Sequence, residues 1–229
     1  MEYSKKYEFF EELIEKDLLT ILNISNVKIP IMKGGLSLSF SGGIESTLLL
    51  YLLLQNSYNK IYACTIVKGK NNKIDEKRSI EALNACVYLT KNKNVEHIVE
   101  YVGLDTEKNS YIKKPIELKQ KKYTTYHYTG ITANPPKDIA DSFIGPEYNQ
   151  DHYLRDPLIN RKVIDDDWIT PFWNVDKLKI ASIYKELDLM ENLFPFTNSC
   201  ESNNATLLNH CGQCWQCKER QWGFNIKCK

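Results

Sequence analysis

The sequence predicts an α/β fold, a doubly wound parallel sheet followed by a small metal-binding region at the C-terminal end. Three observations predict it. Apolar segments rich in β-branched residues alternate with helical patterns. A Ser-Gly-Gly turn joins the first such segment to a strongly apolar helix, and a cluster of cysteines lies near the C-terminus. We expect a helical extension over residues 1–30, an α/β domain over 31–190 and a cysteine-bearing region over 191–229.

The order of the elements follows from their hydrophobic spacing. Residues 4–23 predict an amphipathic helix, which would pack on the sheet or, alternatively, form a dimer contact. Residues 132–170 contain several prolines and predict an irregular lid or substrate loop. The remaining pattern predicts strands at 36–40, 60–67, 95–102 and 123–131, and helices at 44–54, 74–90, 110–122, 175–187 and 213–224.

The turn between the first of these strands and its helix has the features of an anion site. A helix N-terminus presents unpaired N–H groups and the positive end of its dipole. Gly42 and Gly43 allow positive φ angles and a close approach to a ligand. Ser41, Ser46 and Thr47 add hydroxyl groups. The alternative is a plain Gly-Gly turn without a ligand.

Four cysteines in the pattern Cys-x10-Cys-x2-Cys-x2-Cys predict a closed structural metal site, namely Cys200, Cys211, Cys214 and Cys217. Thiolates are soft ligands, so Zn²⁺ is expected and an iron–sulfur cluster is the alternative. His210 could replace one ligand. Cys64 and Cys86 lie in apolar surroundings and are expected in the core, whereas Cys228 is a bystander.

Composition limits the partners. Thirty basic and 29 acidic residues nearly cancel, so the chain has no global field for nucleic acid. The basic run Lys119–Lys122 is expected to be a solvated helix end, and Asp165–Asp167 a loop or helix cap in preference to a metal site. The N-terminus has no signal peptide pattern and no apolar run spans a bilayer, so we expect a cytoplasmic protein without a membrane partner.

The residues quoted above resemble a known family. Ser41-Gly-Gly-Ile-Glu-Ser46 resembles the PP-loop of ATP pyrophosphatases, Ser-Gly-Gly-x-Asp-Ser, with Glu45 in place of Asp. With the cysteine pattern, the chain resembles the 7-cyano-7-deazaguanine synthases (QueC). Further matches to that family are Ser199-Cys200, Thr170-Pro171-Phe172 with Asp176-Lys177, and the tail Cys217-Lys-Glu-Arg-Gln-Trp-Gly-Phe224.

The resemblance implies a fold like that of the adenine nucleotide alpha hydrolases and a site for ATP, Mg²⁺ and Zn²⁺. Ser41, Glu45 and Ser46 would be catalytic, and Glu45 would help to hold Mg²⁺. The implied nucleotide-binding residues are Phe40, Ser41, Gly42, Gly43, Ile44, Glu45, Ser46 and Thr47. Lys68, Lys70 and Asp105 follow later strands and are further candidates, although as surface residues they are expected to be solvated.

The implied reaction is ATP-dependent conversion of 7-carboxy-7-deazaguanine, with ammonia, to an amide and then a nitrile. The segment Tyr128–Asp138 departs from the family's deazaguanine-associated stretch, which leaves a second hypothesis open. In it, a relative stops at the amide or uses another nucleobase-like carboxylate for DNA modification or defence. A third hypothesis is a non-enzymatic, zinc-containing nucleotide-binding module. The partners would be a nucleobase and ammonia, with a homodimer possible.

Overall fold

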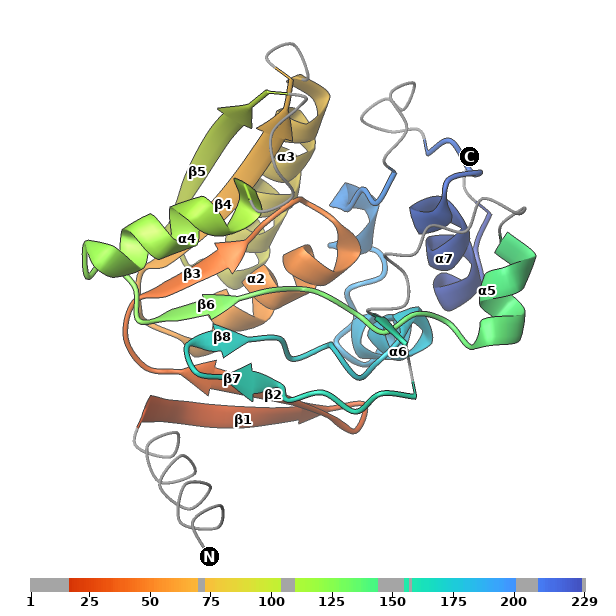
Figure 1. Cartoon of the computed structure of the whole chain (residues 1–229), viewed down its shortest axis with the longest axis horizontal. Helices are drawn as coiled ribbons and strands as arrows, with labels where there is room; N and C mark the ends of the chain where they lie inside the picture. Colours follow the sequence, from red (N-terminus) through yellow and green to blue (C-terminus); the bar gives the residue numbers. More distant parts are fainter. Residues whose placement is uncertain are drawn as a thin grey trace, which may run out of the picture.

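A six-stranded sheet forms the centre of the protein in the computed structural model, which describes residues 17–69, 73–103, 110–143, 155–156, 158–200 and 210–227 (Figure 1). The strand order is β5-β4-β3-β6-β8-β7, in which only β7 is antiparallel to its neighbour. The strands are β3 (Leu36–Ser39), β4 (Ile61–Lys68), β5 (Val95–Val102), β6 (Tyr126–Tyr128), β7 (Ile164–Asp165) and β8 (Trp168–Ile169). The predicted α/β fold with a mostly parallel sheet is confirmed.

Helices cover both faces of this sheet, as Figure 1 shows for α4 on one face and for α2 with α3 on the other. Helix α2 is apolar on nearly all sides and its leucines are buried, which is typical of a central core helix. The helices are α2 (Ile44–Asn56), α3 (Lys73–Thr90), α4 (Ser110–Gln120), α5 (Lys137–Phe143), α6 (Lys177–Glu186) and α7 (Trp215–Phe224), with a 3-10 turn at Phe194–Phe196. None of the helices in the described ranges combines the length and the hydrophobicity that crossing a membrane requires.

The expected helix at residues 4–23 is wrong over residues 18–23. Strand β1 (Leu18–Ile24) pairs antiparallel with β2 (Val27–Met32) in a separate two-stranded sheet. The turn residues Ser25 and Asn26 both have positive φ, 51° and 60°, which suits a tight hairpin. The polar residues Thr20 and Asn23 are three positions apart, a spacing that also fits a helix, so the pattern does not distinguish this run from a strand with a partner. Residues 4–16 lie outside the described ranges, and the three domain boundaries stay predictions.

The segment 132–170 is more regular than expected. It contains α5 as well as the hairpin β7–β8, whose turn includes Asp166 at a φ of 53°. The carboxylate of Asp167 pairs with Lys119 at 2.5 Å, and its carbonyl accepts the His127 N–H. The expected loop at Asp165–Asp167 is therefore a hairpin turn. Strands β7 and β8 have two residues each, which is too short for a recognisable pattern. The sequence therefore gives no clear signal for β8, the fifth parallel strand.

The strand order gives the sheet one topological switch point among the described strands. The chain adds β4 and β5 on one side of β3, and then β6 and β8 on the other side. The connections after β3 and β6 therefore diverge, which makes the carboxyl ends of these two strands the topological switch point where open α/β sheets bind ligands. The Ser-Gly-Gly turn lies at this point, between β3 and α2.

Candidate functional site

The turn from β3 to α2 is held in place by its neighbours. Phe40 donates its N–H to Cys64 of β4, and its carbonyl accepts the Thr65 hydroxyl at 2.6 Å. At the helix start, the carbonyl of Ile44 accepts the buried Tyr184 hydroxyl at 2.8 Å. The side chains of Phe40 and Ile44 lie in the hydrophobic core. Neither side chain is therefore available to a ligand, and Phe40 already uses its own N–H and carbonyl within the protein.

The two glycines of the turn have different conformations. Gly42 has a φ of +73°, as expected, and a Cβ there would lie 3.0 Å from the Arg78 carbonyl oxygen. Gly43 has an ordinary φ of −71° and stands at the N-cap position, where no side chain caps the helix. The expectation of positive φ is thus confirmed for Gly42 and wrong for Gly43. A Cβ at Gly43 would instead enter the space beside the Ser41 Oγ, at 3.1 Å.

Two serine hydroxyls lie beside this uncapped helix start. The Ser46 hydroxyl donates to the Gly43 carbonyl at 3.3 Å and lies 3.3 Å from the Ser41 Oγ. Ser41 is exposed, whereas Ser46 and Thr47 are buried. Within the described residues the Thr47 Oγ1 has no hydrogen-bond partner. Uncapped N–H groups with hydroxyls around them form a cradle suited to phosphate oxygens.

A network of four charges, two of them buried and two partly buried, borders the cradle. The Lys177 ammonium pairs with the Glu45 carboxylate and lies 3.9 Å from an oxygen of Glu219. The other Glu219 oxygen accepts from Arg155 at 2.6 Å. The side chains of Lys177 and Glu219 are only 4% and 1% exposed. Such a pair leaves a costly unpaired charge if one partner is removed, so these residues are expected to act as a unit.

The network keeps Glu45 ionised. Burial by itself would raise the pKa of Glu45, but the adjacent Lys177 ammonium outweighs this effect and lowers the pKa below its ordinary value. Arg155 contributes in the same direction. The Oε1 atom of Glu45 is paired with Lys177. The role of Glu45 as a magnesium ligand stays a prediction.

The loop after β6 lies against the start of α2. A Cβ at Gly130 would lie 3.0 Å from both the Glu45 Cβ and the Ser46 backbone nitrogen, so a side chain here would press on the helix start. Arg155 holds the following residues, since its Nε donates to the Thr132 carbonyl at 2.8 Å. The Thr132 hydroxyl in turn donates to Glu45 at 3.4 Å. The segment that departs from the family pattern therefore lines the site.

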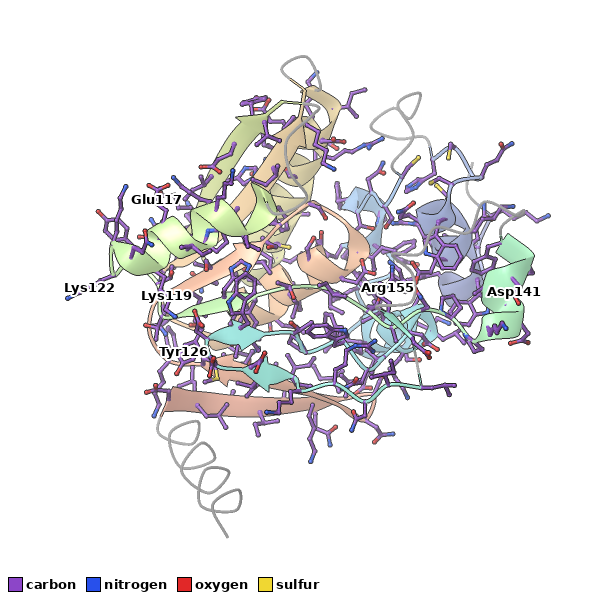
Figure 2. The ribbon with its side chains drawn as sticks, viewed as in Figure 1. Glu117, Lys119, Lys122, Tyr126, Asp141 and Arg155 are labelled. Carbon is purple, nitrogen blue, oxygen red and sulfur yellow. The ribbon has the colours of Figure 1, made fainter. Side chains whose placement is uncertain are left out.

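Sequence reasoning placed Lys177 only within a family motif and gave no role to Arg155, Glu219 or Gly130. Glu219 could have been found as a charged residue within the C-terminal motif, and Gly130 as a glycine directly after a strand. Lys68 is exposed at the end of β4. Lys70 and Asp105 lie outside the described ranges. Figure 2 shows Lys119 and Lys122 at the left edge of the molecule, away from Arg155, which lies to the right of its centre.

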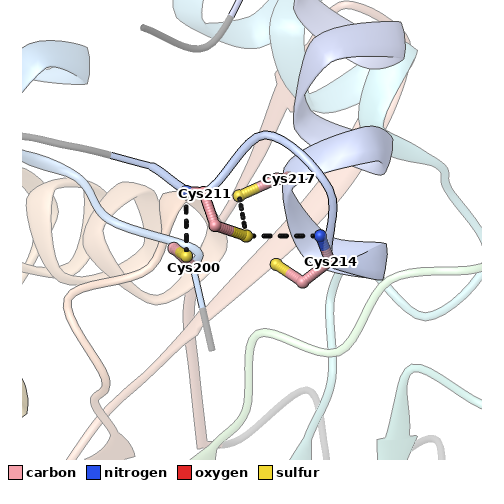
Figure 3. A group of neighbouring side chains, drawn as sticks. All are labelled: Cys200, Cys211, Cys214 and Cys217. Carbon is pink, nitrogen blue, oxygen red and sulfur yellow. Dashed lines mark hydrogen bonds between the residues drawn. The ribbon is translucent and has the colours of Figure 1, made fainter. Parts of the chain in front are cut away.

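The four predicted metal ligands come together beside α7 (Figure 3). The four Sγ atoms all lie within 4.8 Å of one another. The Sγ atoms of Cys211 and Cys217 are 3.9 Å apart. Tetrahedral Zn–S bonds of about 2.3 Å imply Sγ separations of about 3.8 Å. Backbone N–H groups of Cys211 and Cys214 donate to the Cys200 and Cys211 sulfurs, which favours thiolates. The residues therefore fit a closed zinc site with four thiolate ligands.

The other cysteines and histidines are structural in the described residues. Cys64 and Cys86 are buried, as expected, and burial raises the pKa of Cys64 to about 12. Burial lowers the pKa of His127 to about 3, and its ring lies between two serine hydroxyls of β3. His210 lies 3.9 Å from the Cys217 sulfur, next to the complete set of four thiols. His152 and Cys228 lie outside the described ranges.

Comparisons with known proteins support the C-terminal part of this picture. Residues 164–227 match the model of a family described as "Queuosine biosynthesis protein QueC". The match includes α6, α7, Lys177, Glu219 and all four cysteines, and the Ser-Gly-Gly turn lies outside it. No curated protein sequence matches the chain.

Among solved structures, NMN synthetase from Francisella tularensis is similar with a TM-score of 0.42 and 13% identity, over 83% of this chain and 84% of that one. This likeness is too low to carry an argument about function. The family match, in contrast, covers the metal ligands and the helix pair that supports the charge network. It confirms the resemblance expected from the cysteine pattern and the C-terminal tail, over residues 164–227.

Proposed function

We propose that this chain is an ATP-using enzyme that activates a carboxylate and joins it to ammonia, with 7-carboxy-7-deazaguanine as the substrate. The QueC family match supports an ATP-dependent role in modifying a nucleobase. The observation that carries the proposal is the uncapped N-terminus of α2 at the switch point, with the Ser41 and Ser46 hydroxyls beside it. Helix starts of this kind bind phosphate groups.

The phosphates of ATP would lie on the backbone from Ser41 to Thr47. Lys177 and Arg155 stand at the edge of this cradle, and each is already oriented by a carboxylate. Fixed cations that need no reorientation stabilise the charge that develops at a phosphoryl group more than mobile ones do. In this proposal Glu45 orients Lys177, and a bound Mg²⁺ would neutralise phosphate oxygens.

The proposed reaction has two activations. An oxygen of the substrate carboxylate attacks the α-phosphorus of ATP, and pyrophosphate leaves. Ammonia then adds to the acyl carbon, and AMP departs with the former carboxylate oxygen to give the amide. In a second round the amide oxygen attacks the α-phosphorus of another ATP, and pyrophosphate leaves again. Loss of AMP and of the two amide protons leaves the nitrile. The enzyme's contribution is to hold the reactants together and to exclude water.

The amide as final product is the second candidate. The segment after β6 lines the site through Gly130 and Thr132, yet its sequence differs from the family stretch associated with the deazaguanine base. A different base or an earlier product would follow from such a change. The supply of ammonia and a possible homodimer are parts of the proposal that rest on the sequence resemblance.

One incubation distinguishes these candidates. The zinc-loaded protein is mixed with 7-carboxy-7-deazaguanine, ATP, Mg²⁺ and an ammonium salt, and the products are identified by mass. The nitrile with two AMP per product supports the full reaction, and the amide with one AMP supports the second candidate. If pyrophosphate is not released with any nucleobase carboxylate, the enzyme proposal is wrong and a non-enzymatic binding module gains support.

The cradle itself is tested by Gly43→Val. Because φ is −71° at this position, the backbone accepts a side chain without strain, whereas the added methyl groups would fill the space near the Ser41 Oγ. We expect loss of ATP-analogue binding by calorimetry with an unchanged circular dichroism spectrum. Gly43→Ala is the graded control and is expected to weaken binding less. Wild-type affinity in the valine variant would contradict the placement of the phosphates.

A further inference from the structure

A short chain of hydrogen bonds connects the cysteine cluster to the glycine turn. Asn198 donates its backbone N–H to the Gly42 carbonyl at 2.9 Å. The Oδ1 atom of the same Asn198 accepts the N–H of Cys200 at 2.9 Å. Asn198 is 8% exposed and Cys200 is 5% exposed, so water does not compete strongly for these bonds. Only two peptide units separate a metal ligand from a residue that holds the phosphate cradle.

A second contact joins the same two features through α3. The Arg78 guanidinium, which is 5% exposed, donates to the Cys200 carbonyl at 3.1 Å. The backbone of Arg78 and Ser79 lies against Gly42, where a Cβ would meet both residues at 3.0 Å. Gly42 is therefore enclosed between α3 on one side and the Asn198–Cys200 segment on the other. Any shift of Cys200 would be transmitted to the turn from both directions.

We infer that Asn198 is a positioning residue that couples the metal of the four-cysteine site to nucleotide binding. A metal bound by the Cys200 thiolate fixes that residue in space. The side chain of Asn198, in an Asx-type turn, fixes the position of its own backbone relative to Cys200. The Asn198 N–H then orients the Gly42 carbonyl and with it the N–H groups that follow. This inference rests on the proposed function, since it takes the cradle as the nucleotide site.

Coupling of this kind is reciprocal. If the metal strengthens nucleotide binding by some factor, nucleotide must strengthen metal binding by the same factor. Couplings between sites in proteins are typically about 5- to 150-fold. With direct hydrogen bonds between the two sites, we expect an effect of about tenfold. The zinc site would then report nucleotide occupancy without any chemical turnover.

The first experiment measures how fast zinc leaves the intact protein. Zinc-loaded wild type is mixed with a colorimetric chelator, with and without a non-hydrolysable ATP analogue, and the release rate is recorded. We expect release to be about tenfold slower with the analogue. The analogue's affinity is measured separately by calorimetry on the zinc-loaded protein. Metal-free protein is compared as well where circular dichroism shows that it is folded.

The second experiment uses Asn198→Ala, which removes the Oδ1 acceptor but leaves the backbone N–H and all four cysteines. We expect stoichiometric zinc, a weaker affinity for the analogue and a release rate that no longer depends on it. The matched control is Asn92→Ala. Asn92 also bonds backbone through its side chain, to the Leu54 carbonyl at 2.7 Å, but it does so at the far end of α2. Zinc release from the Asn92→Ala variant should be slowed by the analogue as much as it is in wild type.

The possible outcomes distinguish the proposed function from the proposed coupling between the metal site and the nucleotide site. If zinc-loaded wild type does not bind the analogue, the proposed function fails. If it binds the analogue but zinc leaves equally fast with and without it, the coupling is wrong. If the analogue slows zinc release from Asn198→Ala as much as from wild type, the two sites are coupled without Asn198, and the role assigned to this residue is overturned.

Discussion

Gly223 of α7 lies where two helices approach each other too closely for any side chain. A Cβ at this position would lie 2.4 Å from the Cβ of Lys177 in α6, and 2.8 Å and 2.9 Å from its backbone carbon and oxygen. Carbon atoms in normal contact are about 3.5–4.0 Å apart, so Gly223→Ala would separate the helices by about 1 Å. The Lys177–Glu219 contact, at 3.9 Å, would lengthen with them.

The expected magnitude follows from two opposing effects. Replacing glycine by alanine within a helix would by itself stabilise the protein by about 1 kcal/mol. Overpacking costs about 1–3 kcal/mol and occasionally more, and a clash with backbone atoms belongs at the upper end. We therefore expect Gly223→Ala to lower the free energy of unfolding by about 2 kcal/mol. Binding of an ATP analogue should weaken as well, because Lys177 borders the cradle.

Chemical denaturation of the zinc-loaded protein measures this loss, and calorimetry measures the binding of the analogue. Lys218→Ala, on the same helix and partly exposed, is the control and should change the unfolding free energy by less than about 0.5 kcal/mol. An alanine variant at Gly223 that is as stable as wild type or more stable would refute the argument, because helix propensity would then have outweighed the clash.

Three further predictions concern the site. Glu45→Gln should remove a stabilisation that the ionised carboxylate provides above a pH of about 4.3 and that is lost as pH falls through the lowered pKa of Glu45 in the folded state. The difference in unfolding free energy from wild type, measured by denaturation at several pH values, should therefore shrink in acid. A difference that stays constant with pH would count against the ion pair. Gly130→Val should weaken analogue binding at least about tenfold by crowding the helix start, which calorimetry would detect; equal affinity would contradict the close packing. Cys214→Ser should lose both zinc, measured by elemental analysis, and thermal stability, whereas Cys228→Ser should retain both; a metal-replete Cys214 variant would show that the cluster is not the metal site.

The features that sequence could predict are local ones. The Ser-Gly-Gly turn, the apolar helix after it and the spacing of Cys211, Cys214 and Cys217 each place their chemistry within a few residues. The parallel sheet followed from the alternation of elements. Local pattern failed at β1, where the polar residues Thr20 and Asn23 are three positions apart and so fit a helix. The positive φ angles of Ser25 and Asn26, which form the hairpin turn, are visible only in the structure.

The charge network could not be found in this way because its members are distant in sequence. Glu45 and Lys177 are 132 residues apart, and Arg155 and Glu219 are 64 apart. Their contact depends on the order of strands in the sheet and on the close approach of α6 and α7. Lysine residues in helices are usually exposed to solvent, so only its burial in the structure reveals that Lys177 is part of a site.

The four charged side chains beside the cradle sum to zero. A nucleoside triphosphate, a polyanion at neutral pH, therefore meets a neutral quartet and not an excess of positive potential. The helix start supplies only partial charges, equivalent to about half an elementary charge. If the cradle binds ATP as proposed, the nucleotide would therefore bring its own counter-cation, and we expect ATP affinity to depend steeply on divalent metal concentration, far more than on monovalent salt.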